Sequence, residues 1–257
     1  MNREDGHENA LKIAAVITAA GSSDRMGGIK KEYRILPSAS LTVLGSAAMG
    51  FAACKRIGII VFVIPAGGEA EARAALPPNF FDIKKEIFFV QGGPTRQGSV
   101  YNALCLLEAH KPTQVLIHDG ARPWIKTDLI DKVIDAVLSH GAVIPILPMT
   151  ETPKEIDYSG SGTGIITRHL RRRDLGLAQT PQAFNFPDIL KAHKKASGQE
   201  RSGKALSDKE EYTDDAEIWG KFIGPVAVIP GDPQNRKITF LEDLEPRITR
   251  IFTDFHG

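Results

Sequence analysis

Short hydrophobic runs alternate along the chain with longer segments whose apolar residues recur at helical spacing. The hydrophobic runs lie at residues 12–20, 57–65, 86–91, 114–119 and 141–148. They are continuous rather than alternating, which is typical of strands buried on both faces. The segments between them, at about 41–54, 68–76, 98–110 and 127–140, predict amphipathic helices, with Thr127 and Asp128 as candidate N-terminal caps of the last one.

Strands that alternate with helices require crossover connections, which produce a parallel sheet covered by helices. We therefore expect the α/β class, as a Rossmann-like three-layer sandwich with a mostly parallel sheet. Residues 149–168 interrupt the alternation with a polar, Gly- and Ser-rich stretch that turns β-like, and they predict a projecting β-arm. Beyond the arm we expect a helix from Pro187, a charged loop at 194–211, a strand at 225–230 and a last helix from about Leu241. We treat residues 1–257 as one domain with a polar head at 1–11.

Composition narrows the class of protein. Hydrophobic residues make up 42% of the 257 and charged residues 25%, and 32 Lys and Arg almost balance 31 Asp and Glu, as in an ordinary globular protein. Nucleic-acid binders carry a basic surplus, so we expect no nucleic-acid partner and only a local anion site. The head lacks a signal-peptide pattern and no 18-residue apolar stretch occurs, so we expect no membrane association. Cys54 and Cys105 are too few for a disulfide framework or a Cys-rich zinc site, which favours a cytoplasmic location.

The first turn after the first strand reads AAGSSDRMGGIKKEY, from residue 19 to 33. It fits neither the GxGxxG dinucleotide pattern nor a Walker loop. Small residues let backbone N–H groups approach a phosphate, and Arg25, Lys30 and Lys31 follow them. Because a triphosphate needs fixed cations, Arg25 and Lys31 are candidates to bind one. The alternative is a solvated loop with surface lysines.

Six blocks of sequence make this picture specific. They are AAGSSDRMG at 19–27, QGGPTRQGSV at 91–100, IHDGARP at 117–123, QTPQAF at 179–184, YTDDAE at 212–217 and GDPQNRKITFLED at 231–243. In this order they resemble the 2-C-methyl-D-erythritol 4-phosphate cytidylyltransferase family of the non-mevalonate isoprenoid pathway. Each block alone is weak, but six in register from about Ile13 to the C-terminus are a strong signal.

The resemblance implies a Rossmann-like domain that joins CTP to methylerythritol phosphate with Mg²⁺ as cofactor and releases pyrophosphate. It also implies a homodimer in which exchanged β-arms complete each active site. Three cationic residues match the family's triphosphate-binding and catalytic positions: Arg25, Lys31 and Lys237. Nucleotide contacts match Ala19, Ala20, Gly21, Gly93, Ser99 and Asp119, of which Gly93 and Ser99 recognise cytosine and Asp119 is also the candidate ligand of Mg²⁺. Contacts to the second substrate match Arg122, Thr152, Arg172 and Thr213.

Structural roles compete with some of these assignments. Asp119 could cap the turn after its strand, and Arg172 could belong to a basic surface with its neighbours. The pair of His118 and Asp119 suggests a metal site, but successive strand residues face opposite sides, so we expect His118 in the core.

The sequence also departs from the family pattern. Ser23 replaces a glycine, while Lys30 and Glu32 stand where Pro and Gln are usual, which adds a carboxylate beside the phosphate site. Arg236 adds a cation next to Lys237. Two alternatives therefore stay open: a ribitol 5-phosphate cytidylyltransferase, which differs around the polyol pocket, and a nucleotide-binding regulator without turnover.

Overall fold

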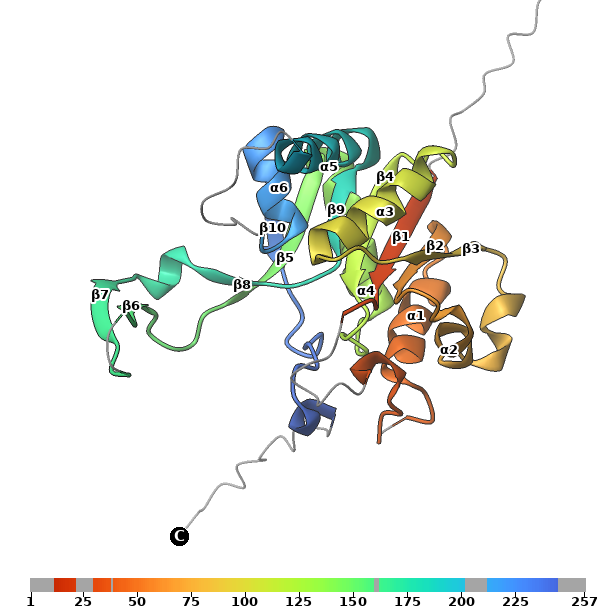
Figure 1. Ribbon diagram of the computed structural model, residues 1–257, viewed down its shortest axis with the longest axis horizontal. Coiled ribbons are helices and arrows are strands. Elements are labelled where there is room, and N and C mark those ends of the chain that lie inside the picture. The colour runs from red at the N-terminus through yellow and green to blue at the C-terminus, as the bar shows by residue number, and fades with distance from the viewer. Residues whose placement is uncertain (1–11, 22–29, 38, 160–161, 202–211, 245–257) are drawn as a thin grey trace, which may run out of the picture.

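The computed structural model describes residues 12–21, 30–37, 39–159, 162–201 and 212–244. Over these residues the main sheet has eight strands in the order β10-β5-β9-β4-β1-β2-β3, with β8 paired to β5 (Figure 1). The strands are β1 (Ile13–Thr18), β2 (Ile57–Ile64), β3 (Glu86–Gln91), β4 (Gln114–Asp119), β5 (Ala142–Pro148), β8 (Gly176–Ala178), β9 (Gln182–Asn185) and β10 (Ala227–Pro230). Only β8 and β9 run antiparallel to their neighbours, so the expected mostly parallel sheet is confirmed over the described residues.

Helices cover both faces of the sheet and form the expected three layers. On one face α1 (Val43–Ala53), α2 (Glu69–Ala74) and α4 (Thr127–His140) pack around a core that contains Ile17, Ile60 and Phe62. On the other face α3 (Arg96–Glu108), α5 (Phe186–Arg201) and α6 (Asp215–Phe222) pack around Val16, Val61 and Ile117. Adjacent residues of β1 thus serve opposite cores, because successive side chains of a strand point to opposite faces.

Two sequence predictions at helix ends were wrong. Helix α4 has Lys126 as its N-cap without a side-chain cap, and Thr127 already belongs to the helix. Helix α5 continues to Arg201, so the charged stretch from 194 to 201 is helical rather than a loop. Lys194 and Lys195 are exposed while Ala196 is buried, as in a helix that has one face in solvent and one against the core. The rest of the expected loop, 202–211, lies outside the described residues. At Leu241 a short 3₁₀ helix, η5 (Leu241–Leu244), is found where a last helix was expected.

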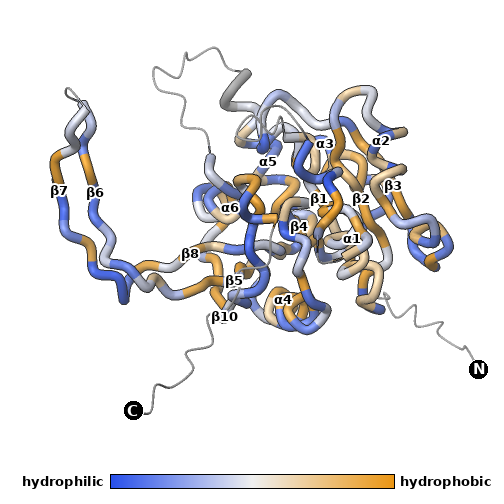
Figure 2. The backbone as a smooth tube through the Cα atoms, turned by 90° about the horizontal axis from the view of Figure 1, so that it is seen from below, coloured by the Kyte–Doolittle hydropathy of each residue, from blue (hydrophilic) through white to orange (hydrophobic). Residues whose placement is uncertain are grey.

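An arm projects from the sheet where the sequence predicted one. Strands β6 (Lys154–Asp157) and β7 (Ile165–His169) form a separate two-stranded antiparallel sheet that stands away from the body (Figure 1). The chain returns through the 3₁₀ helix η4 (Arg172–Asp174) to β8, which pairs with the end of β5. Figure 2 shows hydrophobic positions along β1 and β2 in the body and shorter hydrophobic stretches on the arm strands. Two other 3₁₀ helices, η2 (Lys31–Tyr33) and η3 (Pro78–Asp82), lie in connections.

Among the helices of the described residues, none combines the length and the apolar character that a membrane span requires.

Candidate nucleotide site

The carboxyl ends of β1, β3 and β4 meet at one edge of the sheet. Strands β1 and β4 are parallel neighbours with Thr18 opposite Asp119, and the chain leaves β1 toward β2 on the other side. Ligands of open α/β sheets bind at such a point. A cavity of about 460 Å³ lies here. It is lined by Thr18, Ala20, Gly21, Lys31, Glu32, Gly93, Pro94, Thr95, Arg96, Ser99, Asp119, Ala121 and Lys237.

The turn after β1 provides small residues and two lysines with different environments. Ala20 and Gly21 line the cavity, whereas Ala19 is buried beneath it and donates its N–H to the carbonyl of Val63. Lys30 donates from Nζ to the carbonyl oxygens of Ala19 and Gly21, so it closes the base of the turn. Burial lowers the pKa of Lys30. Lys31 instead lines the cavity, as the sequence predicted, while Arg25 lies outside the described residues.

The turn between β3 and α3 is held by side chains of the turn itself. Thr95 caps α3 by accepting a hydrogen bond from Gly98 N at 3.0 Å. The hydroxyl of Ser99 accepts from Gly93 N at 3.1 Å and donates to the carbonyl of Thr95 at 2.9 Å. A Cβ on Gly93 would lie 2.8 Å from the carbonyl carbon of Gly98, so only glycine fits. Gly93 and Ser99 therefore line the cavity together and form one rigid turn.

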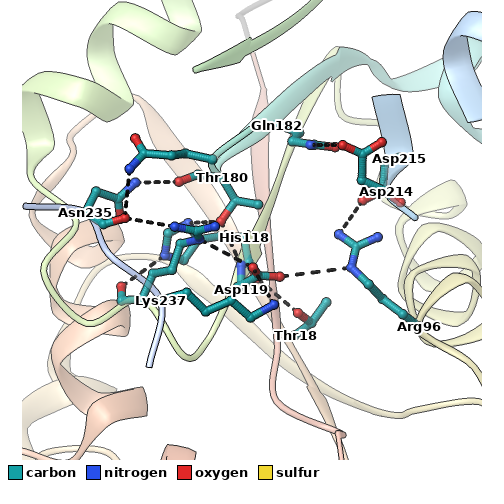
Figure 3. A network of polar contacts seen from close by, with 12 residues as sticks. Thr18, Arg96, His118, Asp119, Thr180, Gln182, Asp214, Asp215, Asn235 and Lys237 are labelled. Carbon is teal, nitrogen blue, oxygen red and sulfur yellow. Dashed lines mark hydrogen bonds and ion pairs between the residues drawn. The ribbon is translucent and has the colours of Figure 1, made fainter. Parts of the chain in front are cut away.

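Asp119 is buried at the end of β4 and faces three cations (Figure 3). Its carboxylate lies 3.1 Å from Lys237 Nζ, 3.4 Å from Arg122 Nε and 4.0 Å from Arg96 Nε. Burial alone would raise the pKa of Asp119, but the opposite charges of Lys237, Arg96 and Arg122 outweigh it and hold this pKa well below its usual range. The cavity therefore contains an ionised carboxylate that is surrounded by positive charge.

Lys237 reaches this site from a loop that is far away in sequence. Gln179 fixes the start of the loop: its Nε2 donates to the carbonyls of Asp232 and Asn235, and its Oε1 accepts from Asp232 N. Asn235 is buried and donates from Nδ2 to the carbonyl of Thr180 at 2.7 Å. Arg122 adds a hydrogen bond from Nη1 to the carbonyl of Asn235 at 2.9 Å. The QTPQAF and GDPQNRKIT blocks thus act together, because one holds the loop of the other.

His118 is fully buried and belongs to the core, as predicted. Its Nδ1 lies 3.0 Å from Thr180 Oγ1, and its Nε2 lies 3.2 Å from the carbonyl oxygen of Arg122. Burial lowers the pKa of His118 to about 4. A neutral imidazole therefore supports the loop that follows β4.

Three predicted substrate residues are not brought to the cavity within this chain. Arg172 lies exposed at the base of the arm and donates from Nη1 to the carbonyl of Thr150, and Thr152 is an exposed arm residue. Thr213 donates from its N–H and its hydroxyl to Glu217 Oε2, just before α6. Arg122, the fourth residue predicted for the second substrate, lies beside Asp119 but is not among the residues that line the cavity.

Sequence reasoning missed several residues of the cavity, above all Arg96. Glu32, which was expected to add a carboxylate beside the phosphate site, is buried and lines the cavity. Arg96 stands inside the QGGPTRQGSV block, immediately after the Thr95 cap. A Thr followed by a helix-like pattern was the signal that could have placed Arg96 at a helix start beside the turn.

The described residues include no group of three or more His, Cys, Asp or Glu side chains that could hold a metal ion. Asp119 is the carboxylate predicted as a metal ligand, and it lines the cavity. Mg²⁺ in phosphate-transfer sites is bound by one or two carboxylates, water and the phosphates of the substrate. This donor set fits such an ion and does not fit a cage made of protein side chains alone.

Comparison with known proteins gives a consistent result. The family model described as "IspD: 2-C-methyl-D-erythritol 4-phosphate cytidylyltransferase" matches residues 13–248. A "Bifunctional enzyme IspD/IspF" of Bartonella tribocorum is 35% identical over 239 residues, covering 92% of this chain and 55% of that protein. One from Bradyrhizobium sp. is 37% identical over 243 residues, covering 93% of this chain and 56% of that protein. The chain thus spans about half the length of these curated relatives.

Solved structures agree with the fold. The 4-diphosphocytidyl-2C-methyl-D-erythritol synthase of Anaerococcus prevotii superposes with a TM-score of 0.75 at 27% identity, covering 92% of this chain and 94% of that one. The 2-C-methyl-D-erythritol 4-phosphate cytidylyltransferase of Francisella tularensis gives a TM-score of 0.71 at 27% identity, covering 91% and 96%.

Proposed function

Because the chain belongs to the 2-C-methyl-D-erythritol 4-phosphate cytidylyltransferase family, we propose that it transfers CMP from CTP to 2-C-methyl-D-erythritol 4-phosphate and releases pyrophosphate. The observation that carries this proposal is one cavity lined by Lys31, Lys237 and the rigid Gly93–Ser99 turn. The cations suit a triphosphate, and the narrow turn suits a pyrimidine. We propose that the described residues form one cytidylyltransferase domain, which carries out this reaction.

The reaction is an in-line attack by a phosphate oxygen of the second substrate on the α-phosphorus of CTP. No nucleophile of the protein is needed, so the protein must offset repulsion and align the two reactants. Two like unit charges 4 Å apart repel by about 4 kcal/mol at an effective dielectric near 20. Lys31 and Lys237 reduce this repulsion, and their effect grows as negative charge builds up around the α-phosphorus.

Different segments around the cavity would bind different parts of the two substrates. Backbone N–H groups of the turn after β1, with Ala20 and Gly21 in the cavity, are placed to approach the phosphates. Gly93 and Ser99 line the part of the cavity that we assign to cytosine. Arg25, outside the described residues, is assigned to the triphosphate from the sequence alone. Arg122 is assigned to the second substrate, as its sequence block predicted.

Asp119 is the residue that would hold Mg²⁺ beside the phosphates. The bound ion would offset part of the negative charge of the triphosphate. Without it, Asp119 orders Lys237 through their ion pair of 3.1 Å, so the same carboxylate positions a cation of the site.

The arm is proposed to pair with a second copy of this chain. Supporting this, Ile165 and Tyr158 are 71% and 68% exposed, and Ile166 is half exposed. Apolar side chains exposed this far on a two-stranded sheet favour an interface. Thr152 and Arg172 lie on the same arm, so in a dimer with exchanged arms they could serve the partner's second substrate.

The location proposed for this protein is the cytoplasm. It is supported by the state of the two cysteines, because Cys54 and Cys105 are both free and Cys105 is exposed. Exposed free thiols are typical of reducing compartments.

The experiment that tests this function supplies CTP, Mg²⁺ and one polyol phosphate at a time, and measures released pyrophosphate. We expect release with methylerythritol phosphate and little with ribitol 5-phosphate. Release with ribitol 5-phosphate alone would assign the chain to that activity instead. If the protein binds CTP but releases no pyrophosphate with either polyol phosphate, the proposed turnover is contradicted and a nucleotide-binding regulator is favoured.

A further inference from the structure

Arg96 is shared between two carboxylates that lie on either side of it (Figure 3). Its Nη2 lies 2.7 Å from Asp215 Oδ2, while its Nε lies 4.0 Å from Asp119 Oδ1 in the cavity. Burial alone would lower the pKa of Arg96, but Asp215 and Asp119 outweigh it and raise this pKa. The guanidinium is thus a permanent cation that is held closely by Asp215 and more loosely by Asp119.

Asp215 is fully buried at the first turn of α6, and its surroundings fix that turn. Asp214 caps the helix by accepting from Glu217 N at 2.9 Å. Gln182 of β9 donates from Nε2 to Asp214 Oδ2 at 2.7 Å, and its Oε1 accepts from Ala216 N at 3.1 Å. Gln182 of the sheet therefore holds the side chain before Asp215 and the backbone after it.

A second buried side chain approaches Asp215 from α5. His193 is fully buried, and its Nε2 lies 3.3 Å from Asp215 Oδ1, outside hydrogen-bonding geometry. The imidazole ring stacks parallel to the ring of Tyr101 on α3, with ring centroids 6.5 Å apart. The carboxylate of Asp215 is therefore enclosed by α3, α5 and α6, and has little room to follow Arg96 if that side chain moves.

We propose that Asp215 is a positioning residue of the nucleotide site, because it anchors one end of the Arg96 guanidinium and so directs the other end at Asp119. The proposal rests on the proposed function for its effect on turnover, but not for its effect on Arg96. Through Arg96, the TDDA block of α6 reaches the cavity without lining it.

The charge balance of the cavity explains why an anchor matters. Asp119 already faces Lys237 at 3.1 Å. If the buried carboxylate loses its charge, Arg96 keeps its own, and Asp119 is the next carboxylate within its reach among the described residues. Arg96 then competes with Lys237 for Asp119 and disturbs the cation that we assign to the α-phosphate. A displacement of about 1 Å at a reacting centre can lower turnover by about 10².

The test compares two neighbouring changes of the same kind. Asp215→Asn removes the anchor of Arg96, whereas Asp214→Asn removes one carboxylate charge from the same helix end and keeps a good N-cap. The position of Arg96 is read directly from the NMR signal of its Nε–Hε group in ¹⁵N-labelled protein. Arg96→Gln assigns that signal by removing it. Turnover is read as pyrophosphate release at saturating CTP, with KM for CTP measured separately.

We expect the Arg96 signal to be sharp in the wild type and in Asp214→Asn, and to broaden or shift in Asp215→Asn. We also expect kcat of Asp215→Asn to fall about tenfold with KM for CTP changed less than about threefold, as for a change that misaligns bound reactants. The double variant Arg96→Gln with Asp215→Asn replaces both charges of the ion pair and leaves no unpaired buried charge at Asp215, so it should fold even if a single variant does not. Its kcat should stay within about threefold of Asp215→Asn, because the two residues act as one unit.

An unchanged Arg96 signal in Asp215→Asn would overturn the proposal. So would equal kcat values for the Asp215 and Asp214 variants, or a double variant whose loss is the product of the two single losses. A wild-type protein that releases no pyrophosphate would instead contradict the proposed function, and the NMR comparison would still decide whether Asp215 positions Arg96.

Discussion

Lys237 and Asp119 form an ion pair of 3.1 Å in the cavity, and each changes what the other contributes. Without Lys237 the site would lose a cation, and Asp119 would be left with less compensation beside the phosphates of CTP. The removal of this one lysine should therefore cost more than a typical surface charge. Lys31 lines the same cavity and adds a second cation to it.

We expect Lys237→Ala, and separately Lys31→Ala, to lower kcat by about 10² or more, since single contacts that stabilise transition-state charge contribute about 3 kcal/mol. Initial rates of pyrophosphate release measure this. Lys132→Ala removes the same charge from an exposed position on α4 and should retain wild-type rates. Near-normal turnover in Lys237→Ala would remove this residue from the proposed role.

His118 predicts a pH dependence of stability. Its pKa is about 4 in the folded protein against about 6.5 when exposed, so between these values the unfolded chain binds the extra proton. The stability from neutral His118 is thus fully present above about pH 6.5 and is lost as pH falls toward 4. The free energy of unfolding should be about 2 kcal/mol lower at pH 5 than at pH 7 from this group, and urea titrations measure it.

The matched variant for this titration is His118→Gln, which cannot take up the proton. Its stability should be lower at pH 7, because a buried contact is altered, but it should change much less between pH 7 and pH 5. If the variant shows the same decrease as the wild type, His118 is not the responsible group.

Many individual site residues could be predicted from the sequence, but those that depend on distant contacts could not. Ala20, Gly21, Lys31, Gly93, Ser99, Asp119 and Lys237 were predicted as site residues, and all of them line one cavity. Arg96 and Asp215 were not predicted, because their importance comes from a contact between residues 119 positions apart. No local pattern contains that pairing. Likewise, the loop around Asn235 depends on Gln179 and Thr180, which spacing alone does not reveal.

Among the elements, the turn between β3 and α3 has a strict packing requirement. Gly93 approaches the backbone of α3 so closely that a methyl group would meet Gly98 and Ser99 at 2.8 to 3.2 Å. Because backbone cannot rotate away as a side chain can, the turn itself would have to shift. That shift would separate Ser99 from Gly93 and widen the part of the cavity assigned to cytosine.

Gly93→Ala should therefore raise the dissociation constant for CTP about tenfold, equivalent to about 1.4 kcal/mol. Isothermal titration calorimetry with CTP and Mg²⁺ measures it. Gly220→Ala is the control, because a Cβ there meets no atom within 4 Å and lies in α6. This control should bind CTP normally and be more stable by up to about 1 kcal/mol. Equal affinities for the two variants would contradict the assigned role of the turn.

The hydrophobic pattern predicted the five long strands and the helices between them, because burial on both faces leaves a continuous apolar run. It could not predict that β9, with four residues, inserts antiparallel between β4 and β5. Short strands carry little periodicity, and their partners are chosen by tertiary packing. The N-cap of α4 was predicted wrongly because local sequence leaves it ambiguous. Thr and Asp are acceptable both as N-caps and in the first turn of a helix, and Thr127 and Asp128 lie in the first turn.

At the scale of the whole molecule, the arm is the feature whose apolar side chains remain exposed in a single chain. Strands β6 and β7 bury little within the chain, and four large apolar side chains on them or beside them are more than 40% exposed: Ile156, Tyr158, Ile165 and Ile166. A two-stranded sheet alone is only marginally stable in water. A second copy would supply the missing cover.

We expect the wild-type protein to be a dimer, and Ile165→Glu to shift it toward monomer because a buried charge would be unpaired at the interface. Light scattering coupled to size-exclusion chromatography measures the mass. Leu138→Glu changes a residue of α4 that is 44% exposed and lies away from the arm, so it should remain dimeric. A monomeric wild type would contradict the exchanged arm.

In the proposed function, cations of distant segments converge on one cytidine triphosphate at the carboxyl edge of β1, β3 and β4. A crystal structure with CTP and Mg²⁺ bound would locate the nucleotide. We expect the triphosphate beside Lys31 and Lys237 and the cytosine against the Gly93–Ser99 turn. Nucleotide density elsewhere on the chain, with this cavity empty, would contradict it.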